Sequence, residues 1–261
     1  MTLGARIEGI GWWSKGLPSW ADARVFVRDG VLPEGASARP SPQLLAPNER
    51  RRAPESVAVA LEVALAACRM AGRDPAVLPS VFASTHGDLG ITDYMSETLA
   101  GPDPASISPT RFHNSVHNAA AGYWTIGAGC MQPATALSAY EATFAQGLLE
   151  ALVQLSTGHA AVLLAVYDTG ATGPIAAIAN TTGTLGGALL LARGEGMGRR
   201  VDARLADGEA PAAEGPLAKR EAGNVMQPML PLFDALARDA ATTLQLDAGA
   251  GRVLVLDIAP A

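Results

Sequence analysis

The segment ATALSAYEATFAQGLLEALVQLSTGHAAVLLAVY, residues 134–167, places an amphipathic run between two apolar stretches. Ala134–Ala139 has the length and composition of a short strand, and Ala160–Tyr167 is a longer apolar strand. Between them, Tyr140–Leu155 repeats its apolar residues at the spacing of an α-helix. This unit predicts two parallel strands joined by a helix, which is the basic repeat of an α/β fold.

A second unit of this kind precedes the first. Val81–Ala83 is an apolar strand that leads into the polar segment Ser84–Asp88, and helices are expected over Thr92–Leu99 and Asn114–Ile126. Further upstream, Pro54–Gly72 has helical spacing and ends at a glycine, a residue that commonly terminates helices. We therefore expect a parallel sheet flanked by helices, with functional residues at the carboxyl ends of its strands.

The two ends of the chain add shorter elements. Apolar or β-branched stretches predict strands or extended pieces at Ala5–Trp13, Arg24–Val27, Ile175–Ile178, Ala188–Ala192, Val201–Leu205 and Arg252–Ile258. Leu230–Ala241 has helical periodicity. Gly208–Ala222 is rich in Ala, Gly, Pro and Glu and is expected to be a flexible loop.

Composition and charge limit the classes of function. The 261-residue chain is 49% apolar, so it can bury a substantial core, and only 5% aromatic, which suits close helix-on-sheet packing. Its net charge of -6 makes nucleic-acid binding an unfavoured function. The longest basic run is the cluster Arg50–Arg52, which is either a solvated surface or a contact for an acidic carrier protein.

The chain carries no sign of secretion or membrane insertion. Met1–Gly16 lacks a basic region followed by a continuous apolar stretch, and the longest apolar run is far shorter than the roughly 20 residues of a membrane span. Cys68 and Cys130 are too few for a disulfide framework and are expected to be reduced thiols. A soluble, cytoplasmic protein is expected.

Several motifs share residue types and spacing with one enzyme family. They are Arg51-Arg52 before the first long helix, Phe82–Asp88, Ile107-Ser108-Pro109, Asn118–Gly122, Pro133, the helix that begins near Glu141, and Gly158. Over roughly residues 1–195 the chain resembles the N-terminal half of a β-ketoacyl synthase. The resemblance implies the thiolase fold, a layered α/β/α arrangement. Its N-terminal half, residues 1–195, would be complete, and residues 196–261 would form a shortened C-terminal portion packed on the same domain.

The resemblance also locates the position of the family's nucleophilic cysteine. That cysteine follows Thr-Ala at the end of a strand and opens a long helix, after a Gly-Pro loop in which this chain has Gln132. Counting back from Gly158 places Glu141 on the cysteine, whereas the dipeptide Ser138-Ala139 places Tyr140 there. The nucleophile is absent in either register.

The chemistry of condensation is therefore not expected of this chain. A carboxylate suits a helix N-terminus but is a poor acyl carrier and repels an oxyanion. The family's two catalytic histidines come from its C-terminal half, and all four histidines here lie upstream of that region: His86, His113, His117 and His159. Glu141 is interpreted as a helix cap, with a malonyl-mimicking or decarboxylating role as the alternative. No cofactor is expected.

Two further sites remain open as alternatives. Cys130 with His113 or His117 would be a Cys/His nucleophilic pair of a stand-alone acyltransferase, although Cys130 follows a glycine-rich segment and is more simply a packing residue. His113 and His117, at i and i+4, would share one helical face, but no third metal ligand is evident. No metal site is predicted, and interface hydrogen bonds are favoured for both histidines.

The segment Phe112–Asn118 and the short length are similar to chain length factors of aryl polyene and xanthomonadin-type pathways. The resemblance implies a heterodimer with a full-length β-ketoacyl-ACP synthase that supplies the cysteine and histidines, and an acyl carrier protein that reaches the complex. The nucleophile-proximal strand would lie at the interface. The residues expected to line the acyl tunnel or this interface are Tyr94, Phe112, Asn114, His117, Asn118, Tyr123 and Leu137.

Overall fold

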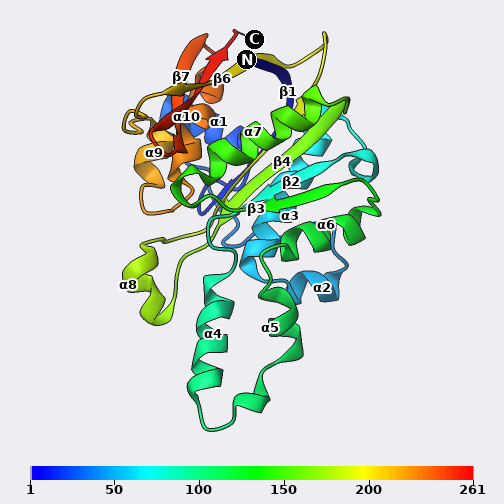
Figure 1. The fold of residues 1–261 in the computed structure, drawn as a ribbon, viewed down its shortest axis with the longest axis vertical. Coiled ribbons are helices and arrows are strands. Elements are labelled where there is room, and N and C mark those ends of the chain that lie inside the picture. The colour runs from blue at the N-terminus through cyan, green and yellow to red at the C-terminus, as the bar shows by residue number, and fades with distance from the viewer. Residues whose placement is uncertain (1, 261) are drawn as a thin grey trace.

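One mixed eight-stranded sheet runs through the part of the chain that the computed structural model describes, residues 2–260 (Figure 1). Its strand order is β3-β2-β4-β5-β1-β6-β8-β7. The strands are β1 (Leu3–Ser14), β2 (Ser80–Ala83), β3 (Ala134–Leu137), β4 (Ala161–Asp168), β5 (Leu185–Ala192), β6 (Arg199–Asp207), β7 (Thr242–Gly249) and β8 (Arg252–Ile258).

The helices connect these strands and cover both faces of the sheet. They are α1 (Trp20–Asp29), α2 (Pro47–Arg52), α3 (Glu55–Ala71), α4 (Leu89–Ala100), α5 (Pro109–Asn114), α6 (Ala119–Ala128), α7 (Thr143–Ser156), α8 (Ala176–Ala179), α9 (Pro216–Arg220) and α10 (Leu230–Arg238). Short 3-10 turns lie at η1 (Pro75–Val77), η2 (Pro104–Ser106), η3 (Tyr140–Ala142), η4 (Gly173–Ile175) and η5 (Gln227–Met229). No helix within residues 2–260 combines the length and hydropathy that a bilayer crossing requires.

The predicted strand–helix–strand unit is present. β3 and β4 both pair in parallel with β2, which lies between them, and α7 connects them. The expected parallel pairing is limited to β3, β2 and β4, because β5, β1, β6, β8 and β7 pair with their neighbours in antiparallel fashion. No crossover helix long enough to return the chain in parallel lies between β4 and β5 or between β7 and β8.

Two apolar cores lie on opposite faces of the sheet, so the molecule has three layers. Trp13 faces a core formed with α3 and α6, whereas its neighbour Trp12 faces a core formed with α1, α7 and α10. The helix α3 crosses β1 so closely that a Cβ at Gly11 would collide with the backbone carbonyl of Val63. The glycines of β1 thus permit the helix-on-sheet contact expected from the composition.

The C-terminal strands extend the same sheet. β6 pairs with β1 on the side opposite β5, and β8 and β7 follow as a hairpin. The side chain of Gln146 in α7 donates a hydrogen bond to the carbonyl of Ala248 in β7, at 2.7 Å. The expected division into residues 1–195 and 196–261 falls in the connection between β5 and β6 and stays a prediction.

Four elements differ from the sequence-based expectation. Arg24–Val27 lies in α1, where the Ser19 side chain accepts a hydrogen bond from the Asp22 amide and Gly30 ends the helix in the left-handed region. Ile175–Ile178 lies in η4 and α8, outside the sheet. Part of the predicted loop Gly208–Ala222 forms α9, and the strand β7 was not predicted at all.

The predicted helix over Asn114–Ile126 is also wrong in its extent. The chain forms two helices, α5 and α6, with a break over Ser115–Asn118. The helices α4 and α5 project together from the body as an antiparallel pair (Figure 1). The break turns the chain from this projection back onto the sheet.

Candidate functional site

A strained turn joins β3 to α7 at the position where the sequence placed the missing nucleophile. Tyr140 has a φ of 54°, a left-handed conformation that residues with a side chain rarely adopt. Thr143 stabilises the turn, because its hydroxyl accepts a hydrogen bond from the Ala139 amide at 3.0 Å and donates one to the Tyr140 carbonyl at 2.6 Å. Strained backbone of this kind is often found at functional sites.

Glu141 follows this strained residue but does not cap the helix. It lies in η3, two residues before α7 begins, and is exposed. No side chain makes a capping hydrogen bond at the start of α7. The interpretation of Glu141 as a helix cap is therefore wrong, and the Thr143 hydroxyl holds the turn instead.

The buried carboxylate of Asp168 ties this turn to the ends of the neighbouring strands. Asp168, at the end of β4, accepts hydrogen bonds from the Ser84 hydroxyl at 3.0 Å and from the amides of Thr85 at 2.8 Å and His86 at 3.1 Å. The Thr85 hydroxyl in turn donates to the Tyr140 carbonyl at 3.2 Å. The loop after β2 thereby fixes both Asp168 and the strained turn.

A cavity of about 470 Å³ opens beside the strained turn. Its polar lining comes from His86, Glu141, Asn180, Asn224 and Asp247, and Tyr140 lies among them. No cysteine lines it. None of its side chains therefore supplies a thiolate to carry an acyl group.

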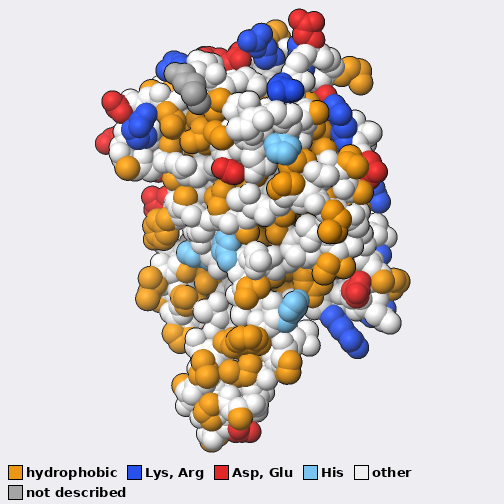
Figure 2. Space-filling view, turned by 45° about the vertical axis from the view of Figure 1, so that its right-hand side comes forward, with side chains coloured by type: hydrophobic (Ala, Val, Ile, Leu, Met, Phe, Trp, Pro, Cys, Tyr) orange, Lys and Arg blue, Asp and Glu red, His pale blue; other side chains and the backbone are white. Residues whose placement is uncertain are grey.

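An apolar surface extends from the open edge of the sheet. β3 pairs only with β2 among the described strands, so its outer edge is unpaired. Ile126, at the end of α6, is 84% exposed, and Met131, just before β3, is 93% exposed. Figure 2 shows hydrophobic side chains running down this face towards the projecting end of the molecule. We call Ile126, Met131, Phe112 and Val116, together with the β3 edge, the apolar face.

The residues predicted to line the tunnel or the interface lie in different surroundings. Phe112 is 60% exposed on the apolar face, and Leu137 lies at the end of β3, half-buried beside α7. Tyr94 holds α4 against α5, because its hydroxyl accepts a hydrogen bond from the Ser108 amide at 3.0 Å and Arg111 lies 4.0 Å above its ring. Asn114 is only 4% exposed and lines a different cavity.

The break between α5 and α6 separates the two histidines expected on one helical face. His113 lies in α5 with its ring edge against Tyr123, at 6.5 Å between centroids. His117 lies in the break and donates from Nε2 to the Ser84 carbonyl at 2.8 Å. Asn118 is exposed at the start of α6. Among residues 2–260, no group of three or more His, Cys, Asp or Glu side chains could hold a metal ion.

The structure does not bring Cys130 to His117. Its Sγ donates to the Leu78 carbonyl, 3.4 Å away, before β2 begins, whereas His117 contacts Ser84 after β2 ends. Six residues of extended chain span about 20 Å. Both cysteines are buried, and burial raises the pKa of the Cys68 thiol to about 12. The alternative of a Cys/His nucleophilic pair therefore has no support in the geometry.

Sequence reasoning missed the two residues that organise the site. Asp168 was not singled out, although an aspartate that directly follows an apolar strand is a recognisable signal for a polar group at the carboxyl end. Asn224 is buried, and its amide donates to the Thr182 carbonyl at 3.1 Å. No local sequence signal identifies it, because it lies between the predicted loop Gly208–Ala222 and the predicted helix that begins at Leu230.

A model described as the β-ketoacyl synthase N-terminal domain matches residues 25–256, most of the chain. A search of curated protein sequences gives no significant match.

Solved structures match over the full length. The ketosynthase ApeO in complex with its chain length factor ApeC, from Xenorhabdus doucetiae, contains a chain that is 23% identical with a TM-score of 0.75, over 98% of this chain and 99% of that one. The ishigamide ketosynthase/chain length factor gives 16% identity and a TM-score of 0.69, with 99% of each chain covered.

A third structure holds a type II PKS acyl-carrier protein with its ketosynthase bound to the hexaketide, and gives 12% identity and a TM-score of 0.73 over 100% of both chains. At these identities the matches show the fold alone. The expected thiolase-like α/β/α fold is confirmed, and the shortening of its C-terminal half stays a prediction.

The Asp168 network generates a prediction about stability and pH. Burial raises the pKa of Asp168, and the donors Thr85, His86 and Ser84 oppose the shift. An unfolded aspartate has a pKa of about 3.9, so above that pH the folded protein binds more protons than the unfolded chain. The stability that Asp168 contributes is thus fully present below that pH and is lost as the pH rises through the folded pKa.

We expect Asp168→Asn to lower the free energy of unfolding by about 1–3 kcal/mol near pH 4, because an amide nitrogen has no lone pair for the Thr85 N–H, whereas a protonated carboxyl oxygen keeps one. The difference from wild type should shrink as the pH rises from there through the folded pKa of Asp168. Urea denaturation across this range measures it. Asp207→Asn, which alters a carboxylate that is 93% exposed, is the control with little effect. A difference that grows with pH contradicts the raised pKa.

Proposed function

The chain belongs to the β-ketoacyl synthase family, and from that premise we propose that it is a non-catalytic subunit of the chain-length-factor type, which pairs with an active synthase and shapes its acyl tunnel. The observation that carries the proposal is the absence of a thiol at the strained turn between β3 and α7. Tyr140 and Glu141 occupy both candidate positions of the cysteine. Neither side chain can form the thioester that condensation requires.

The apolar face supports pairing with a second family member. An unpaired strand edge presents free amide and carbonyl groups, and proteins normally cover or charge such an edge. Here the side chains beside β3, including Ile126 and Met131, are apolar and exposed. A partner that covers this edge would remove the unpaired backbone groups of β3 and the apolar side chains beside it from water. A full-length β-ketoacyl-ACP synthase would supply the nucleophilic cysteine and the two catalytic histidines of the family, for which this chain has no counterparts.

The proteins of similar structure support the same proposal. Two of them are ketosynthases described with their chain length factors, and a third includes an acyl-carrier protein. The chain and its counterparts cover each other almost completely, so their lengths are similar. We propose that this chain acts in aryl polyene-type biosynthesis, as its resemblance to chain length factors of such pathways implies, with an acyl carrier protein reaching the complex through the synthase.

Pairing through the apolar face is tested by adding a charge to it. Met131→Asp should abolish co-purification with a co-expressed synthase, because the carboxylate would be buried without a partner. Since Met131 is 93% exposed, the variant should fold as the wild type does. Met197→Asp is the matched control, because Met197 is 90% exposed in the connection between β5 and β6. Unchanged co-purification of the Met131 variant would place the interface elsewhere.

The tunnel role is tested by removing bulk from α4 and α5. Phe112→Ala and Tyr94→Ala should lengthen the products of the reconstituted pair, because both side chains project from the segment that we assign to the tunnel. Mass spectrometry of the released products measures the change. Tyr94→Phe separates bulk from the hydrogen bond to Ser108 and should leave product length unaltered. If neither Ala substitution changes product length, the segment does not contact the growing chain.

The inert character of the carboxylate is tested by Glu141→Gln. The substitution preserves size and removes the charge, and Glu141 makes no capping contact with α7. The reconstituted pair should therefore condense acyl units at the wild-type rate. A loss of turnover, measured as CO₂ release from a malonyl thioester, would instead favour a decarboxylase role for Glu141.

A further inference from the structure

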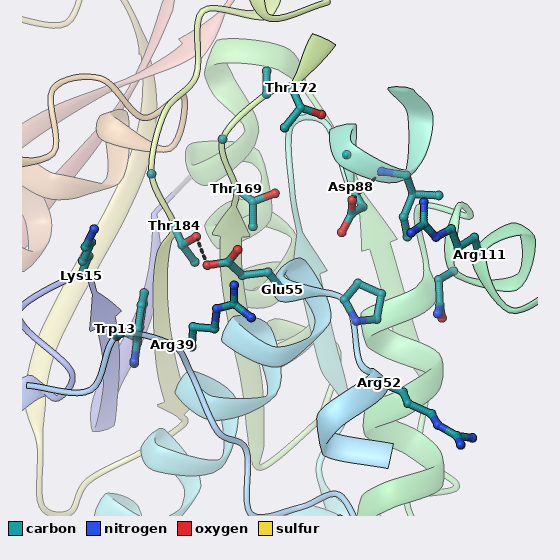
Figure 3. Close-up of a pocket in the computed structure, with 18 of the residues that line it drawn as sticks. Trp13, Lys15, Arg39, Arg52, Glu55, Asp88, Arg111, Thr169, Thr172 and Thr184 are labelled. Carbon is teal, nitrogen blue, oxygen red and sulfur yellow. Dashed lines mark hydrogen bonds between the residues drawn. The ribbon is translucent and has the colours of Figure 1, made fainter. Parts of the chain in front are cut away.

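A second cavity of about 850 Å³ lies on the α3 side of the sheet and is not part of the site described above (Figure 3). It opens between the start of α3, the helices α4 and α5, and the segments that follow β1 and β4. Its lining includes Trp13, Pro54, Thr169, Thr172 and Thr184. We call it the α3 cleft.

Cationic side chains outnumber carboxylates in the α3 cleft, although the whole chain has a net charge of -6. Figure 3 shows Arg39 directed towards Glu55 in the middle of the cleft, with Lys15 on one side and Arg111 on the other, while Arg52 turns outwards. Within residues 2–260, neither Lys15 nor Arg39 forms an ion pair.

The two carboxylates of the cleft already have partners. Asp88 accepts hydrogen bonds from the Ile91 amide at 2.9 Å and the Ser56 hydroxyl at 2.7 Å. Glu55 accepts one from the Thr184 hydroxyl at 2.6 Å. The acids are thus engaged in holding the walls together, and the cations facing the cleft remain available for an anion.

The start of α3 adds to the positive potential. This helix of 17 residues begins at Glu55, and no side chain caps it, since Pro54 occupies the capping position. Pro54 and Glu55 both line the cleft. The first amides of a helix point outwards and carry partial positive charge, an arrangement that favours phosphate groups.

Asn114 provides an independent indication of a ligand. It is 4% exposed and lines the cleft, and its Oδ1 has no hydrogen-bond donor in the described part of the chain. A buried acceptor without a partner is destabilising, because it has given up its hydrogen bonds to water and gained none in return. A ligand that carries a hydroxyl or amide N–H would satisfy it.

We propose that the α3 cleft binds a small phosphate ester. Its phosphate lies against Arg39, Lys15 and the first amides of α3, and its hydroxyl or amide group donates a hydrogen bond to Asn114 Oδ1. The charged side chains on its walls, Lys15, Arg39, Arg52 and Arg111, suit a phosphate better than an alkyl chain. The inference goes beyond the proposed function and does not depend on it.

The test uses the full chain and glycerol 3-phosphate, which carries both a phosphate and hydroxyl donors. Isothermal titration should detect saturable binding of this probe and none of glycerol. Arg39→Gln should weaken binding by about tenfold or more, because a charge-assisted hydrogen bond is lost. Arg204→Gln, an exposed cation on β6, removes the same charge elsewhere and should leave the affinity unchanged.

Two further variants separate the parts of the site. Asn114→Ala should weaken glycerol 3-phosphate binding while sparing inorganic phosphate, which has no body to reach Asn114. Glu55→Gln should tighten both, because it removes a negative charge beside the anion. Equal affinities of wild type and the Arg39 variant, or weaker binding after Glu55→Gln, would overturn the proposal.

Discussion

The carboxylate of Asp168 holds together the end of the sheet at which the candidate site lies. Three donors from the loop after β2 converge on it, and the same loop reaches the strained turn through Thr85. Asn224 binds the neighbouring carbonyls and brings the C-terminal region to the same point. These contacts fix the geometry of the strand-to-helix turn, which carries Tyr140 and Glu141 and no thiol.

The retained turn and the exposed apolar face have a common explanation. If the chain acts as proposed, as a subunit that pairs with a synthase and carries no acyl group, strand β3 and the helices around it must keep the position that the partner contacts. Strain at Tyr140 is tolerated because the hydroxyls of Thr85 and Thr143 over-determine the turn. Under the proposed function, pairing depends on the position of β3, which the turn fixes, and does not depend on a thiol.

The sequence predicted the parts of the fold that depend on periodicity and motif spacing. β3, α7, β4 and α3 follow from apolar spacing, and the family resemblance follows from residues that flank them. The break at Ser115–Asn118 could not be predicted, because the apolar pattern continues through it and the His117 contact with Ser84 is long-range. The antiparallel direction of the strands depends on which distant strands pair, and α1 depends on the Ser19 cap. Local apolar spacing indicates neither.

The candidate site was predicted less completely for the same reason. The absence of a thiol can be read directly from the identities of Tyr140 and Glu141. The roles of Asp168, Asn224 and Asn114, in contrast, depend on which distant groups they contact.

The central claim is that this chain pairs with a synthase and carries no acyl group itself. Intact-mass analysis of the co-purified pair after exposure to an acyl thioester tests it most directly. The account predicts one acyl adduct, on the synthase only, and an adduct on this chain would contradict it.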